Sequence, residues 1–181
     1  MEEKYKTILE SSYKPQKEFA KDIEKYGYSY DPELSSMDTK VFYDPKTNQP
    51  EIVYRGSKRV SDWVSNLNLA LGGKDKTLDE ALETAKKVKE KYGKAPITSG
   101  HSRGGYFAEK AGEYVQSPKT VTYNKATMPL DIFKKINPVQ EDWRTSGDLV
   151  SLPSVLQQGK KRTIKLKKPV NPIEAHGFNY L

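Results

Sequence analysis

A serine with one glycine two residues before it and another two residues after it lies near the middle of this 181-residue chain. Residues 100–104 read Gly-His-Ser-Arg-Gly, which fits the G-x-S-x-G pattern of a sharp strand-to-helix turn that exposes the serine hydroxyl. Glycine is needed at both ends because a Cβ there would clash with the neighbouring strand or the incoming helix. The apolar run 95–98 and the residues 106–115 predict that strand and that helix. We therefore expect Ser102 to be a nucleophile.

The chain has two histidines, so a serine nucleophile has little choice of general base. His101 directly precedes Ser102, and adjacent side chains on an extended strand point to opposite faces, so His101 is not expected to accept the serine proton. When the chain order is serine, acid and then histidine, the histidine lies on a late loop, as His176 does. A surface histidine without a role is the alternative. We expect His176 to be the base.

The acid that completes such a set must lie between the serine and the histidine. The carboxylates in that interval are Glu109, Glu113, Asp131, Glu141, Asp142, Asp148 and Glu174. The two glutamates on the helix after the turn are expected to point away, and the acids just before Trp143 to be solvated edge charges. Asp148 follows the strand predicted near Trp143, and the carboxyl end of a strand is where such sheets position their chemistry. A turn aspartate after a glycine is the alternative; we expect Asp148 to be the acid.

Four blocks of residues together resemble the lipase class 3 family of α/β-hydrolases. They are residues 52–57 (Ile-Val-Tyr-Arg-Gly-Ser) with 61–67 (Ser-Asp-Trp-Val-Ser-Asn-Leu), 97–105, 147–153 (Gly-Asp-Leu-Val-Ser-Leu-Pro) and 175–180 (Ala-His-Gly-Phe-Asn-Tyr). They are similar to the family's strand ending in Arg-Gly-Thr/Ser with its Asp-Trp segment, its serine elbow, its acid loop and its late histidine block. The blocks follow one another in the family's order.

This resemblance implies a lipase or another esterase, with phospholipids among the substrates, that works through an acyl-enzyme. Ser102 would be the nucleophile, His176 the general base and later the general acid, and Asp148 the group that orients the histidine and stabilises its cation. The oxyanion hole would combine the backbone N–H of Arg103 with a donor from Ser57. A non-catalytic lipid- or protein-binding module that retains the fold is the alternative. A protease or thioesterase on the same fold would share the triad.

The chain departs from the family in two respects. Arg103 stands where the family usually has leucine, and its guanidinium either points outward or meets an anionic group such as a lipid phosphate. The chain is also short, and residues 58–73 take the place of a lid whose apolar side chains either cover the site or pack as an ordinary helix. Arg55 is expected to anchor its loop rather than to touch substrate, and a packed structural ion pair is the alternative.

The predicted elements alternate between helix and strand. Helices are expected at 2–12, 16–26 and 77–93, with an amphipathic segment at 131–136 that Asp131 caps, and strands at 39–43, 51–54, 120–123 and near Trp143. This order predicts an α/β fold, α/β-hydrolase-like, with a mostly parallel central sheet flanked by helices. We expect one domain over residues 1–181, with residues 1–35 as an N-terminal helical arm packed on it.

The composition bounds the class of protein. The chain carries a net charge of +7, with 35% hydrophobic and 30% charged residues and no cysteine. No stretch has the apolar length of a membrane crossing, and the first residues lack the pattern of a secretory signal. We expect a soluble, most simply cytoplasmic protein that uses neither a cofactor nor a metal.

The densest basic run lies at residues 160–168. Its charged side chains alternate with Ile164 and Leu166, which predicts an edge strand with lysines on its outer face. Attraction to an anionic membrane surface is the alternative. The run lacks aromatic residues at stacking positions, so nucleic acid is not an expected partner. The expected partner is a lipid or small ester substrate, with peripheral contact to an anionic membrane.

Overall fold

The computed structural model describes residues 1–57, 76–128 and 131–181. In this part of the chain, one seven-stranded sheet has its strands in chain order. They are β1 (Ser29–Asp31), β2 (Thr39–Asp44), β3 (Gln49–Tyr54), β4 (Ile97–His101), β5 (Thr120–Tyr123), β6 (Gln140–Thr145) and β7 (Lys161–Ile164). The first three strands pair antiparallel, and β3 to β7 pair parallel. The predicted mostly parallel sheet is confirmed.

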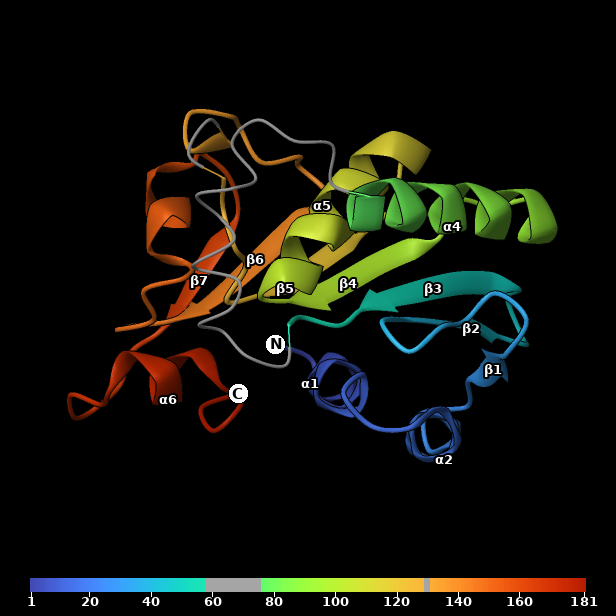
Figure 1. Cartoon of the computed structure of the whole chain (residues 1–181), viewed down its shortest axis with the longest axis horizontal. Helices are drawn as coiled ribbons and strands as arrows, with labels where there is room; N and C mark the ends of the chain where they lie inside the picture. The colour runs from blue at the N-terminus through green and yellow to red at the C-terminus, as the bar shows by residue number, and fades with distance from the viewer. Residues whose placement is uncertain (58–75, 129–130) are drawn as a thin grey trace.

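Helices cover both faces of this sheet (Figure 1). The helices are α1 (Glu3–Ser11), α2 (Gln16–Glu24), α4 (Lys76–Tyr92), α5 (Arg103–Val115) and α6 (Pro172–His176), with the 3-10 helix η2 (Leu152–Leu156). The pair α4 and α5 lies on one face, whereas α1 and α2 lie on the other (Figure 1). Within the described residues, no helix is both long enough and apolar enough to cross a bilayer.

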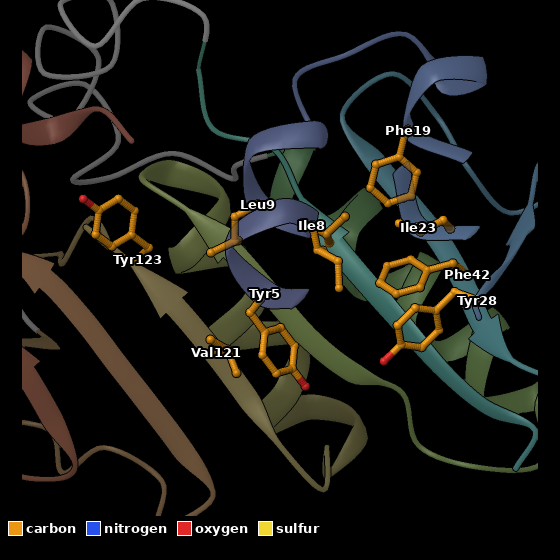
Figure 2. Close-up of a cluster of buried hydrophobic side chains, with 10 residues drawn as sticks. Tyr5, Ile8, Leu9, Phe19, Ile23, Tyr28, Phe42, Val121 and Tyr123 are labelled. Atoms are coloured by element: carbon orange, nitrogen blue, oxygen red, sulfur yellow. The ribbon is translucent and has the colours of Figure 1, made fainter. Parts of the chain in front are cut away.

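The helices α1 and α2 bury an apolar cluster against the sheet (Figure 2). The cluster comprises Tyr5, Ile8, Leu9, Phe19, Ile23, Tyr28, Phe42, Val53, Val121 and Tyr123. The rings of Phe19 and Phe42 meet edge to face, with centroids 5.6 Å apart. Burial of a side chain of this size contributes about 1.5–3 kcal/mol. The first two helices therefore cover one face of the core, and the turn between them reaches the candidate site.

Two predicted segments differ in the structure. Asp131 forms ion pairs with Lys110 and Lys134, at 2.9 and 2.5 Å, and residues 132–134 after it form a turn and a bend rather than a helix. The strand predicted within the basic run is shorter than that run, since β7 ends at Ile164, but it does lie at an edge of the sheet. The predicted lid, residues 58–73, lies outside the described residues.

A buried ion pair lies between α5 and the sheet, where none was predicted. The ammonium group of Lys125 contacts the carboxylate of Glu109 and lies 2.9 Å from that of Asp142. Burial by itself lowers the pKa of Lys125, but the two carboxylates outweigh it and raise that pKa above its ordinary value. The lysine therefore remains charged, and it joins α5 to β6 through the loop that follows β5.

Candidate active site

The turn from β4 into α5 places Ser102 in a backbone conformation that side chains rarely adopt. Its φ is 58° and its ψ −127°. Such a conformation costs about 1–3 kcal/mol for a residue other than glycine. A Cβ on Gly100 would overlap the backbone of Gly104, and one on Gly104 would overlap the carbonyl group of Tyr54. Both glycines of the motif are thus needed for close approach of the backbone.

Hydrogen bonds from three directions hold this turn. The N–H of Ser102 donates to the carbonyl of Tyr123 at the end of β5, at 3.1 Å. The carbonyl of Ser102 accepts from the N–H groups of Gly105 and Ala126, at 3.0 and 3.1 Å. The strained residue is therefore fixed by its own helix and by the neighbouring strand and loop.

Asp148 lies in the loop after β6 and contacts the imidazole of His176. Nδ1 of His176 lies 2.9 Å from Oδ1 of Asp148, and both side chains are buried. The N–H groups of Val150 and Ser151 donate to the same carboxylate, each at 3.0 Å. Burial alone raises the pKa of Asp148, but the hydrogen bonds from His176 and the loop lower it below its ordinary value. The carboxylate thus stays ionised and orients the ring.

The remaining ring nitrogen of His176 faces no protein partner. Because Nδ1 donates to the carboxylate, Nε2 of the neutral ring is an acceptor with a free lone pair. It is buried and makes no hydrogen bond with the described residues, Ser102 included. A general base requires an oriented nitrogen with a free lone pair, as Nε2 of the neutral ring has. The hydrogen bond between a serine and its base is often long before substrate binds.

Ser57 borders two cavities. A cavity of about 290 Å³ is lined by Ser57, His176 and Phe178, among others. A smaller one of about 170 Å³ is lined by Ser57, Arg55 and Arg103. The structure therefore brings both predicted oxyanion residues to one cavity and places the predicted base at its neighbour.

Two arginines at the smaller cavity are held in different ways. Arg55 forms an ion pair with Asp38, which was the alternative for this residue, and its backbone N–H donates to the carbonyl of Asp38 at 2.8 Å. The guanidinium of Arg103 lies over the ring of Phe107, 4.9 Å from its centroid. Arg103 therefore runs along the first turns of α5, beside the cavity.

Asn124 positions the end of α6, the short helix that carries His176 where a late loop was predicted, and no sequence pattern marks Asn124. Its side-chain N–H groups donate to the carbonyls of Ala175 and His176, each at 3.0 Å. Its side-chain oxygen accepts from the N–H of Thr145 at 2.8 Å. Its place directly after a predicted strand was the one available signal.

In the described part of the chain, no group of three potential ligands could hold a metal.

Comparisons with known proteins place the chain among phospholipase-like sequences. Residues 11–155 match the phospholipase-like family of Tle-like phospholipase domains. Over 75 residues, the chain is 33% identical to the extracellular phospholipase A1 of Serratia liquefaciens, a match that covers 41% of this chain and 23% of that enzyme. The chain thus spans about a quarter of that relative.

Solved structures show the same fold. The lipase of Rhizomucor miehei in its propeptide complex superposes with a TM-score of 0.58 at 13% identity, over 89% of this chain and 66% of that chain. A fungal lipase in an inhibitor complex gives a TM-score of 0.57 at 16% identity, over 81% and 71% of the two chains. The chain therefore belongs to the phospholipase-like family of Tle-like phospholipase domains, and it shares the fold of these two lipases.

Proposed function

We propose that this chain is a serine esterase that cleaves the carboxylic ester bonds of lipids, phospholipids above all. The oriented pair of Asp148 and His176, with a free Nε2 atom, is the observation that carries this proposal. The strained elbow places Ser102 directly before α5, and we assign His176 as the base that activates its hydroxyl. Membership of a phospholipase-like family supports ester hydrolysis as the reaction.

The proposed reaction passes through an acyl-enzyme. Oγ of Ser102 attacks the ester carbonyl while its proton moves to Nε2 of His176, and Asp148 stabilises the imidazolium that forms. The imidazolium then gives this proton to the departing alcohol. Water enters, loses a proton to the same nitrogen and releases the acid from the serine. The imidazolium finally gives the proton taken from water to Oγ of Ser102, which regenerates the free serine and the neutral histidine.

The oxyanion in this reaction needs donors beside the serine. The backbone N–H of Arg103 is the first peptide N–H of α5, where the helix dipole also favours negative charge. Ser57 borders the same cavity and supplies the second donor. Loss of one such donor typically costs about 2.7–4 kcal/mol of barrier.

A phospholipid fits the charge at this site. Arg103 lies beside the cavity that contains the proposed oxyanion donors, and a guanidinium binds phosphate oxygens with two parallel hydrogen bonds. The phospholipase A1 that resembles part of this chain supports a phospholipase A-type substrate. We therefore assign Arg103 to recognition of an anionic head group.

The site would face an anionic membrane. Leu149, Leu152 and Val155 recur every third residue along the acid loop and η2, and 61%, 51% and 45% of their surfaces are exposed. A three-residue period aligns side chains on one face of a 3-10 helix. Lys167 and Lys168 lie beside the other end of that loop. Apolar and basic side chains thus flank the loop that holds Asp148, within the single domain we propose for the chain.

The test is hydrolysis of phospholipid vesicles by the wild type and by Ser102→Ala, His176→Ala and Asp148→Asn variants. Each variant is expected to lose about 10⁴-fold in kcat, because the triad acts as a unit. Ser99→Ala, which changes a buried serine on β4, is the matched control and should retain turnover. Vesicle binding without fatty acid release by the wild type would favour the alternative, a lipid-binding module.

A further inference from the structure

The hydroxyl of Tyr13 joins two parts of the proposed site that are distant in sequence. Tyr13 lies in the turn between α1 and α2. Its oxygen accepts a hydrogen bond from the N–H of Gly56 at 3.0 Å and lies 2.7 Å from Nδ1 of His101. Its ring packs edge to face on Phe178, with centroids 5.7 Å apart.

The chain of hydrogen bonds continues through His101 to the proposed base. Nε2 of His101 lies 2.8 Å from the backbone carbonyl of His176. A carbonyl only accepts, so Nε2 carries the proton and Nδ1 is the acceptor. Tyr13 therefore donates its proton to Nδ1 while it accepts from Gly56. Each donor and acceptor role in the chain is thereby determined.

This chain links three segments that the proposed reaction must keep in register. Gly56 precedes the proposed oxyanion residue Ser57, His101 precedes Ser102, and the last acceptor belongs to the base itself. All three lie around one cavity, which Tyr13, Ser57, His101 and His176 line together. A serine, a base and an oxyanion donor must agree in position to fractions of an ångström for catalysis.

We propose that Tyr13 and His101 are positioning residues. Through this hydrogen-bonded chain they hold the Gly56–Ser57 backbone and the end of α6, which carries His176, in place relative to Ser102. The inference rests on the proposed function, since it assigns these residues to the same site. The turn between α1 and α2 is then part of the active site as well as part of the core.

His101 must stay neutral to fill this place. Its ring centroid lies 4.8 Å from that of His176, so a charge on His101 would oppose protonation of the base. Burial, with the nearby His176, lowers the pKa of His101 to about 3. A neutral His101 also keeps the lone pair on Nδ1 that receives the proton of Tyr13.

The direct test compares Tyr13→Phe with Tyr54→Phe on a soluble ester. Tyr54 is the matched control because its buried hydroxyl donates to the carbonyl of Ala81 at 3.1 Å, away from the site. Tyr13→Phe is expected to lower kcat about tenfold, with KM changed less than about twofold. Tyr54→Phe is expected to lower thermal stability without a change in kcat. Equal kcat values for Tyr13→Phe and the wild type would overturn the inference.

A second pair of variants keeps the test decisive if Tyr13→Phe does not fold. His101→Gln retains an amide donor for the carbonyl of His176, whereas His101→Leu removes it. The inference expects His101→Gln to recover most of the kcat that His101→Leu loses, and equal kcat values in both variants would overturn it. A wild type without ester turnover contradicts the proposed function instead, so the two failures are distinguishable.

Discussion

Nδ1 of His176 lies 2.9 Å from Oδ1 of Asp148, and the pair is buried between the loop after β6 and the end of α6. Two backbone N–H groups of the same loop donate to this carboxylate. The contact therefore fixes both the tautomer and the direction of the imidazole before any substrate arrives. It also makes part of the stability of the fold depend on pH.

Asp148 is expected to stabilise the fold at neutral pH and to lose this effect in acid. Its pKa in the folded chain lies below the ordinary value, so the carboxylate favours the folded state above about pH 4. As the pH falls through the folded pKa, that contribution disappears. Urea unfolding should therefore show a larger cost of Asp148→Asn at about pH 7 than at about pH 3. An equal cost at both values would contradict a stabilising, hydrogen-bonded Asp148 carboxylate.

Ester turnover is expected to fall when the solution is acidified from about pH 8 to about pH 5, because protonation removes a histidine base. His101 cannot cause this loss, since its pKa of about 3 keeps it neutral throughout the interval. The chain has no third histidine, so His176 is the histidine that remains to act as the base. Initial rates on a soluble ester measure it, and a flat profile would argue against a histidine base.

The strain at Ser102 predicts that glycine is better tolerated there than alanine. Both variants lack the hydroxyl and should be inactive, but Ser102→Gly should be more stable than Ser102→Ala by about 1 kcal/mol. Ser99 on the preceding strand β4 offers a control, and glycine should be the less stable substitution there. Thermal unfolding of the four variants measures the difference. The same order at both positions would mean that the elbow is not strained.

Anionic lipid is expected to be the preferred substrate at low salt. Each basic residue near an anionic leaflet contributes roughly 1 kcal/mol, an attraction that salt weakens. Hydrolysis of anionic and neutral phospholipid vesicles at low and high salt measures this preference. Arg103→Leu should lose about fivefold on anionic vesicles and leave the hydrolysis of a neutral soluble ester unchanged. Equal hydrolysis rates on anionic and neutral vesicles would contradict a role of Arg103 and of the lysines near β7 in substrate recognition.

Local signals explain why much of the fold was predictable. The glycines at positions 100 and 104 are needed because the backbone packs too closely there for a Cβ. This requirement appears within five consecutive residues, so the sequence alone reveals it. Apolar periodicity likewise predicted α4 and most strands. The strand β1 spans Ser29–Asp31, which is too short to show a period, and it was missed. The turn at Asp131 differs from the predicted capped segment because ion pairs to two lysines satisfy the aspartate instead.

Contacts between side chains that are far apart in the sequence could not be predicted, because only the folded topology brings them together. Lys125 meets Glu109 and Asp142 because three separate elements converge behind the elbow, and no spacing in the sequence reports such convergence. The same holds for Tyr13, which lies 88 positions from its partner His101. Sequence reasoning excluded His101 as the base but contained no signal for its bond to the carbonyl of His176.

The central claim is that Ser102 is the nucleophile of an acyl-enzyme. Reaction with a fluorophosphonate probe, followed by peptide mass mapping, tests it most directly because the probe forms a stable adduct with an activated serine. The account predicts one adduct per chain, on the peptide that contains Ser102. It also predicts much slower labelling of His176→Ala and none of Ser102→Ala. An adduct on another residue, or labelling that persists in Ser102→Ala, would contradict it.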